Sequence, residues 1–174
     1  MITNFKQFNE NLLVPRNIEG RKEKLKQMNI KLLSQEVIDG DLILDESFMD
    51  IDPKFVKLKK VNGYVWLVGG QWTEIPEWLK NIEIEGYFNC SNNKLTTLKN
   101  CPQKIGTDLF CSNNILTSLE GCPEIIKRIF WCDNNLLTSL EYCPEFIGGN
   151  FECVSNKVKL ELPGYVKLKG EFRN

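Results

Sequence analysis

Apolar and polar residues alternate in short stretches through most of this chain. In residues 84–90, IEGYFNC, an apolar or small side chain stands at every second position, which predicts a β-strand with one buried face. The same stretch returns 21 residues later at 105–111, and again at 126–132 and 147–153. A fixed period of this size is typical of stacked coils, so the pattern predicts a solenoid whose successive coils pair as parallel strands.

Weaker copies extend the repeat in both directions. The same spacing appears in residues 38–44 and 61–67, each opening a coil of 23 residues, and again in 168–172. Six residues, one of them proline, separate Leu98 from the next coil at Ile105, which predicts a return side that is extended or a single 3₁₀ turn. We expect about seven coils over residues 38–174 as one structural unit, with starts near residues 38, 61, 84, 105, 126, 147 and 168.

Several columns of repeated residues follow the predicted strands. The cysteines suit small, buried positions, and an inward asparagine can bond backbone groups of neighbouring coils that would otherwise be buried without partners. We expect two structural ladders, Cys90, Cys111, Cys132 and Cys153, and Asn93, Asn114, Asn135 and Asn156. A column of apolar residues keeps the same period at Leu95, Leu116, Leu137 and Val158.

The repeat FxCSNNxLTSLEGCP resembles the leucine-rich repeat, whose pattern L-x-L-x-x-N-x-L is matched by residues 88–95. This variant is similar to short leucine-rich-repeat-like proteins of tailed phages and to the repeat region of bacterial effector ubiquitin ligases. The resemblance covers residues 84–158 specifically. It implies a leucine-rich-repeat solenoid with a parallel β-sheet on one face, and a bacteriophage protein that binds and modulates a host or viral protein. The ligases' separate catalytic domain has no counterpart in these 174 residues, so only recognition is implied.

Residues 1–37 stand outside the repeat. Leu25, Met28, Leu32 and Leu33 follow near-helical spacing, with basic residues between them. Because a solenoid must cover the open end of its core, we expect an N-terminal helical cap over this segment. The alternative is a helix that docks on a partner.

Composition and charge narrow the class of protein. The 42% apolar residues suffice for one buried core, and a net charge of −1 gives no general attraction to nucleic acid or to an anionic membrane. No apolar run is long enough to span a bilayer, and the start MITNFKQFNENLL is not a secretory signal. We therefore expect a cytoplasmic protein with reduced cysteines, in the host cytoplasm if a phage encodes it.

The sequence offers no evident metal, cofactor or catalytic site. The cysteines are 10 or 11 residues apart rather than in close pairs, and the chain has no histidine, so a zinc site is disfavoured. Disulfides between adjacent coils would be strained, because their side chains point the same way. The acidic residues of 39–52 lack the EF-hand spacing and favour a solvated face over a calcium site. We expect a protein that is not an enzyme and needs no cofactor.

The outward face of the predicted sheet carries the candidate binding residues. If Phe88 and Cys90 point inward, their neighbours point outward, and the same alternation exposes Asp108. The middle coils then present Tyr64, Trp66, Tyr87, Phe110, Ile129 and Trp131, flanked by Asp41, Asn150, Glu152 and Arg173. A contiguous group of large apolar side chains on an open face is typical of a protein-binding surface. A register shifted by one residue, or coverage by the cap or by another copy, is the structural alternative.

Two further expectations concern other residues. Trp72 and Trp78 lie at the turn and return side of the second coil, where core filling is expected. The strand near Phe172 offers an edge, so self-assembly into a homo-oligomer or a virion-associated structural component is the alternative function.

Overall fold

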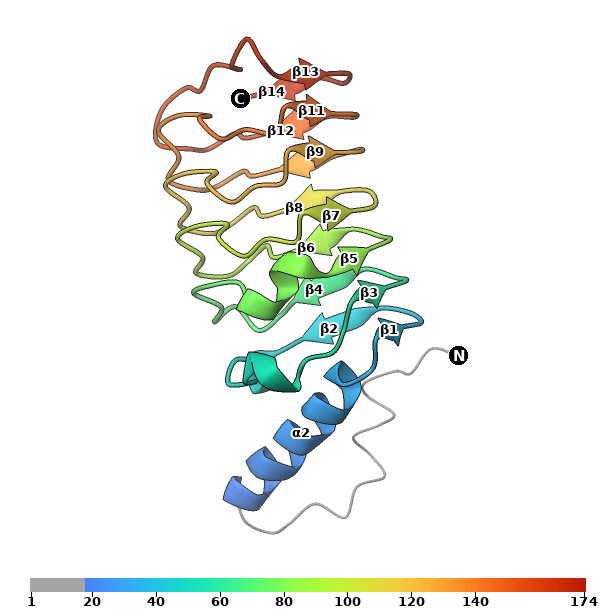
Figure 1. Cartoon of the computed structure of the whole chain (residues 1–174). Helices are drawn as coiled ribbons and strands as arrows, with labels where there is room; N and C mark the ends of the chain where they lie inside the picture. The colour runs from blue at the N-terminus through green and yellow to red at the C-terminus, as the bar shows by residue number, and fades with distance from the viewer. Residues whose placement is uncertain (1–17) are drawn as a thin grey trace.

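The computed structural model describes residues 18–174, which form a stack of about seven coils preceded by one α-helix (Figure 1). Helix α2 spans Ile18–Leu33, and each coil contributes two short strands. The first strands of the coils are β1 Val37–Ile38, β3 Lys60–Val61, β5 Glu83–Ile84, β7 Lys104–Ile105, β9 Ile125–Ile126, β11 Phe146–Ile147 and β13 Lys167–Leu168. The second strands are β2 Leu42–Leu44, β4 Val65–Leu67, β6 Phe88–Asn89, β8 Leu109–Phe110, β10 Phe130–Trp131, β12 Phe151–Glu152 and β14 Phe172–Arg173.

Each strand pairs in parallel with the same strand of the adjacent coil. The second strands form one seven-stranded sheet, whereas the first strands form a sheet of four, β1 to β7, and a sheet of three, β9 to β13. Equivalent residues of successive coils are aligned in the sheet, so Phe130 pairs with Leu109 of the preceding coil and with Phe151 of the following coil. The expected solenoid of about seven parallel coils is confirmed.

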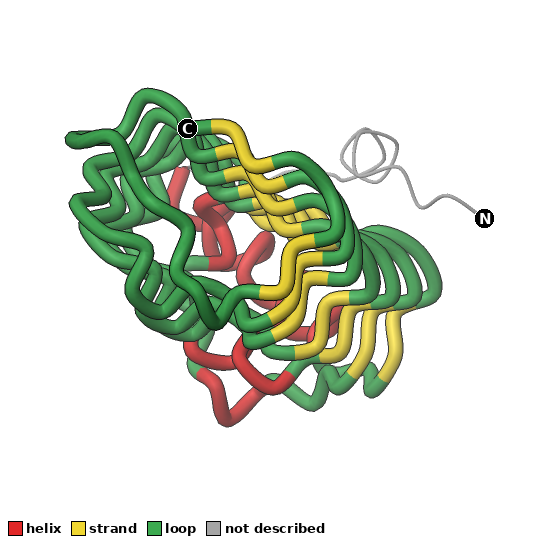
Figure 2. Tube along the Cα trace, turned by 90° about the horizontal axis from the view of Figure 1, so that it is seen from above, coloured by secondary structure: helices red, strands yellow, loops and turns green. Residues whose placement is uncertain are grey.

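The expected single strand through residues 84–90 is instead two strands separated by a corner at Gly86. At this corner the backbones of successive coils touch: a Cβ on Gly86 would lie 2.8 Å from the carbonyl oxygen of Gly63, and one on Gly106 would lie 1.8 Å from that of Glu85. The chain can therefore bend here because glycine leaves room for the backbone of the preceding coil. Figure 2 shows the result, two rows of strands joined by loops.

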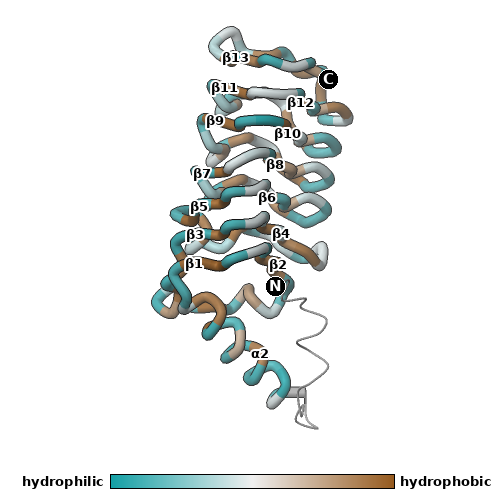
Figure 3. The backbone as a smooth tube through the Cα atoms, turned by 90° about the vertical axis from the view of Figure 1, so that its right-hand side faces the viewer, coloured by the Kyte–Doolittle hydropathy of each residue, from teal (hydrophilic) through white to brown (hydrophobic). Residues whose placement is uncertain are grey.

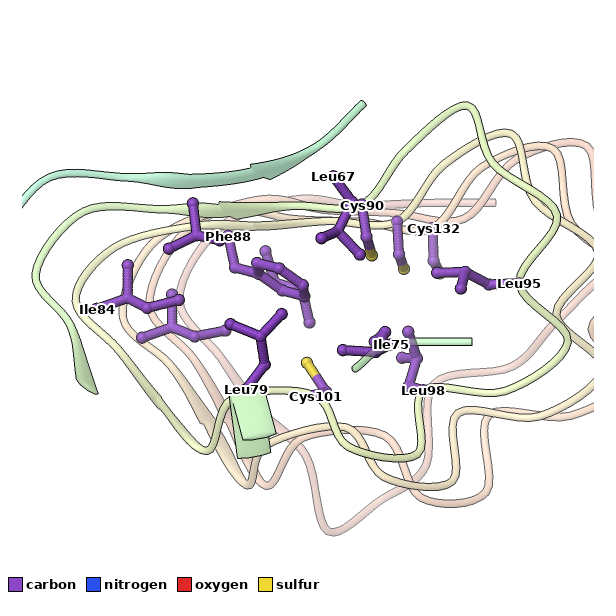
Figure 4. Close-up of a cluster of buried hydrophobic side chains, with 14 of the residues drawn as sticks. Leu67, Ile75, Leu79, Ile84, Phe88, Cys90, Leu95, Leu98, Cys101 and Cys132 are labelled. Carbon is purple, nitrogen blue, oxygen red and sulfur yellow. The ribbon is translucent and has the colours of Figure 1, made fainter. Parts of the chain in front are cut away.

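Alternating residues of the strands fill the interior. Phe88, Leu109, Phe130 and Phe151 form a fully buried column. The rings of Phe130 and Phe151 stack at 4.9 Å between centroids. Cys90 and Cys132 point inward next to this column, and Leu98 and Cys101 reach them from the return side (Figure 4). The two sides of each coil thus share one continuous core.

Each buried asparagine bonds the backbone of two coils, its own and the preceding one. Asn114 donates from Nδ2 to the carbonyl oxygens of Cys90 at 3.0 Å and Cys111 at 3.1 Å, and its Oδ1 accepts the N–H of Leu95 at 3.0 Å. Asn135 repeats these bonds one coil later. In the described part of the chain, no buried side-chain nitrogen or oxygen lacks a hydrogen-bond partner. The ladder therefore supplies partners to backbone groups that the tight turns leave unpaired.

The return sides differ along the stack. The first two coils contain the 3₁₀ helices η1 Glu46–Phe48, η2 Pro53–Phe55 and η3 Glu77–Asn81, and the later coils have turns and bends in these places. Trp72 and Trp78 are buried, as their positions predict. Val158 departs from its column: it is 49% exposed, and Leu160 is buried nearby.

Helix α2 lies at the N-terminal end of the stack (Figure 3). Leu33 is fully buried, and Asn29 donates from Nδ2 to Ser47 Oγ at 2.8 Å in helix η1 of the first coil. These contacts place the helix against the end of the core. The cap expected over residues 1–37 is described only from residue 18, and residues 1–17 lie outside the described part.

Candidate functional site

The outward residues of the seven-stranded sheet form two columns. The first column, just before each strand, contains Asp41, Tyr64, Tyr87, Asp108, Ile129, Asn150 and Glu171. The second column, on the strands themselves, contains Ile43, Trp66, Asn89, Phe110, Trp131, Glu152 and Arg173. The six residues singled out in the sequence therefore lie on one side of the sheet, and we call them the aromatic face: Tyr64, Trp66, Tyr87, Phe110, Ile129 and Trp131.

Four rings of the aromatic face form a continuous row. Tyr64 and Tyr87 stack at 4.6 Å between centroids with an interplanar angle of 4°. Tyr87 meets Phe110 edge-on at 5.7 Å, and Phe110 meets Trp131 at 5.0 Å and 52°. Because each ring rests on the next, their side chains are held in place before any partner binds, which lowers the entropy cost of binding.

Exposure varies along the aromatic face. Trp66 is 37% exposed and Trp131 is 38% exposed, while the other four side chains are half-buried. These fractions leave each residue a surface for contact, although its base is packed. Such amphipathic packing is typical of side chains that anchor an interface.

The row changes columns between the third and fourth coils, where Asp108 occupies the first column. Alternation predicts that Asp108 is exposed, but it is only 6% exposed. Its carboxylate folds back so that Oδ1 accepts the N–H of Ile129 at 2.8 Å, and Oδ2 lies 3.9 Å from Nη1 of Arg128. Asp108 thus accepts a backbone hydrogen bond from the next coil instead of extending into solvent. The row of rings continues through Phe110 in the second column.

Polar residues border the row at both ends. At the N-terminal end, Asp41 Oδ1 accepts the N–H of Tyr64 at 3.1 Å. At the other end, Arg173 pairs with Glu152 at 3.1 Å and with Glu171 at 2.8 Å. The arrangement has an apolar centre and a charged rim, the usual anatomy of a protein interface.

The tyrosine hydroxyls at the N-terminal end stay protonated. Partial burial, followed by the negative charge of Asp41, raises the pKa of Tyr64, and the same two causes raise the pKa of Tyr87. Both hydroxyls can therefore donate hydrogen bonds at neutral and mildly alkaline pH.

The sequence alone did not single out Asp133, which also borders the row. It follows Trp131 by two residues, and its Oδ1 accepts the N–H of Val154 at 3.0 Å while its Oδ2 accepts a bond from Ser112 Oγ at 3.3 Å. The signal was present, since Asp133 stands where the earlier coils have serine in CSNN.

The cysteines are unsuited to nucleophilic chemistry. All seven are free thiols, and six of them are buried. Burial raises the pKa of Cys90 to about 12 and of Cys143 to about 12, so neither forms the reactive thiolate at neutral pH.

The acidic residues of the first coil have local structural partners. Asp45 and Asp52 accept backbone N–H groups at the starts of η1 and η2, and Asp39 accepts a bond from the side chain of Asn62 at 2.6 Å. Among residues 18–174, no group of three metal-ligating side chains is positioned to hold an ion.

Two general findings complete the description. Within the same range, the helices are too short or too polar to cross a membrane. Comparison of the chain with protein-family models, with curated proteins and with solved structures found no match.

Proposed function

We propose that this chain is a protein-recognition module that binds its partner through the aromatic face. The observation that supports this proposal is the continuous row from Tyr64 to Trp131, which is flanked by the exposed ring of Trp66. Preordered aromatic side chains in a contiguous patch are the residues that contribute most to the free energy of protein association.

The ring geometry favours a protein over a nucleic acid as the ligand. Tyr64 and Tyr87 cover each other's faces, so the stack offers ring edges and hydroxyl groups. Stacking of a nucleobase requires an open ring face together with a basic groove, whereas carboxylates border this row. Edges and hydroxyls instead suit the apolar side chains and carbonyl groups of a protein surface.

The proposed class is a leucine-rich-repeat-like recognition protein of a phage, acting in the bacterial cytoplasm on a host or viral protein. The 21-residue repeat with its buried asparagines supports this assignment. The function is binding, which inhibits, redirects or scaffolds the partner, and it requires no catalytic group or cofactor.

A pull-down from infected and uninfected bacterial lysates tests the proposal. The baits are the wild type, the triple variant Trp66→Ala, Tyr87→Ala, Trp131→Ala, and a matched control, Ile125→Ala, Leu136→Ala, Tyr142→Ala, which truncates large side chains exposed elsewhere. We expect a stoichiometric protein on the wild type and the control, and its loss from the triple variant with unchanged circular dichroism. Equal capture by all three baits would contradict the proposal.

Self-association is the second candidate function. Strand β14 is last in its sheet and pairs with β12 alone among the described strands, which supports it. Native mass measured against concentration tests it: a mass that rises with concentration in the wild type and not in Phe172→Lys would favour self-association. A constant monomer mass would exclude it.

A further inference from the structure

The charges that border the aromatic face are not balanced. Asp41 and Asp133 accept hydrogen bonds only from neutral groups among the interactions described above. Neither takes part in an ion pair formed within residues 18–174. Neither carboxylate is therefore balanced by a cation of the described part of the chain.

The cations of the same surface are already paired. Arg128 lies 3.9 Å from Asp108, and Arg173 bonds both Glu152 and Glu171. The uncompensated charge around the row is thus negative: Asp41 lies one coil before Tyr64, and Asp133 lies two residues after Trp131 in the same coil.

The spacing of the two carboxylates defines the size of a partner segment. Asp41 belongs to the first coil and Asp133 to the fifth, so four strand spacings of about 4.8 Å separate them by about 19 Å along the stack. The rings of Tyr64, Tyr87 and Phe110 occupy the three coils between them, and Trp131 lies in the same coil as Asp133. A separation of about 19 Å corresponds to about six residues of extended chain or about thirteen residues of helix.

We infer that the aromatic face binds a basic segment of its partner protein, with apolar side chains on the ring row and lysine or arginine side chains at Asp41 and Asp133. This inference rests on the proposed function and specifies the chemistry of the partner. The opposite charges accelerate encounter and fix the position of the segment along the row, while the aromatic residues supply most of the affinity. An acidic partner is repelled by the same carboxylates.

Selection from a displayed library of random 16-residue peptides tests this inference. Peptides are selected on the wild type and counter-selected on the triple variant of the aromatic face, so that only binders of this face remain. We expect the enriched peptides to carry a net positive charge, with lysine or arginine on both sides of apolar residues. Enriched peptides that are neutral or acidic would overturn the inference.

The affinity of one enriched synthetic peptide provides the second readout. Asp41→Asn and Asp133→Asn remove the charges but keep the side-chain oxygens that accept the backbone bonds, and together they should weaken binding about tenfold at low salt. The matched control, Asp50→Asn with Glu124→Gln, removes two charges outside the aromatic face and should leave the affinity unchanged. Salt should weaken wild-type binding and affect the Asp41, Asp133 double variant much less.

The outcomes separate the two proposals. Peptides that depend on the rings but not on Asp41 or Asp133 would refute the basic partner and retain the recognition function. If no peptide is enriched on the wild type over the triple variant, both fail together.

Discussion

The first two coils and the later coils fill the interior of the solenoid in different ways. In residues 38–83 the interior is filled by large side chains such as Trp72 and Phe48, and the return sides contain 3₁₀ helices. In residues 84–153 small cysteines alternate with phenylalanine and leucine, and an asparagine ladder bonds the turns. The regular coils therefore depend on a repeated set of small groups, whereas the irregular coils depend on a few large ones.

The two regions meet at Asn93. Its Nδ2 donates a hydrogen bond to the carbonyl oxygen of Leu67 at 3.0 Å, and its Oδ1 accepts one from the backbone nitrogen of Trp72 at 3.3 Å. The first asparagine of the ladder thus bonds the last irregular coil. A regular repeat can therefore follow an irregular coil when one side chain forms hydrogen bonds with the backbones of both.

Alkaline pH should separate the two regions most strongly, because all the cysteines lie in the regular coils. Burial raises the pKa of Cys90 from 9.0 to about 12, and burial also raises the pKa of five further thiols. Below pH 9 these thiols are protonated in both states. Above it the unfolded chain loses protons that the folded chain keeps, so each thiol should lower the free energy of unfolding by about 1 kcal/mol per pH unit.

Urea unfolding under reducing conditions, repeated from pH 8 upward in steps of about one unit, measures this slope. The double variant Cys90→Ala, Cys111→Ala removes two of the six thiols with a raised pKa. It should therefore reduce the thiols' contribution to the pH dependence of the free energy of unfolding by about a third. Tyrosines and lysines titrate in the same range, so an unchanged slope in the double variant would assign the pH dependence to them.

Removal of one asparagine from the ladder should be the next largest effect. Asn114→Ala leaves the Leu95 N–H and the Cys90 carbonyl without this partner, and we expect a loss of about 4 kcal/mol in the free energy of unfolding. Asn113→Ala is the control, since Asn113 is exposed and its cost of about 1 kcal/mol comes from its positive φ of 55°. Equal losses in the two variants, by urea unfolding, would show that the ladder bonds contribute little.

A large side chain of the irregular coils gives the matching test. Trp72 is 2% exposed and donates from Nε1 to the carbonyl oxygen of Val68, so Trp72→Ala should cost about 3 kcal/mol. Trp66→Ala, on the exposed face, should cost less than about 1 kcal/mol. Because coils contact only their neighbours, hydrogen exchange should accelerate in the coils around Trp72 and stay unchanged beyond residue 126. Faster exchange through the whole stack would indicate that the two regions unfold as one unit.

The smallest effect concerns an imperfect repeat within the regular coils. Tyr142 has φ of 64°, at the place where the preceding coils have Gly121 with φ of 90° and Asn100 with φ of 68°. Tyr142→Asn should raise the free energy of unfolding by about 0.5 kcal/mol, because asparagine tolerates this conformation better. Thermal unfolding measures it, and a lower melting temperature would show that the Tyr142 ring contributes more packing than its backbone conformation costs.

The period of the sequence was sufficient to predict about seven parallel coils and most of the inward and outward alternation. It could not predict the corner, because Gly86 fits the alternation of a straight strand as well as it fits a bend. It also placed Asp108 outward by alternation alone, whereas the hydrogen bond to the next coil buries it. The corner at Gly86 and the burial of Asp108 both depend on contacts between neighbouring coils. The alternation of residues within one coil gives no information about such contacts.

The asparagine ladder also allows the stack to change in length. Each asparagine bonds the backbone of its own coil and of the preceding coil, and the asparagine of the following coil bonds this coil in the same way. A duplicated block of 21 residues would therefore find every backbone partner it needs, and the flanking coils would keep theirs. Gene duplication in whole repeats could lengthen the aromatic face by one strand spacing at a time, and so alter which partner segment fits it, without any change in the core.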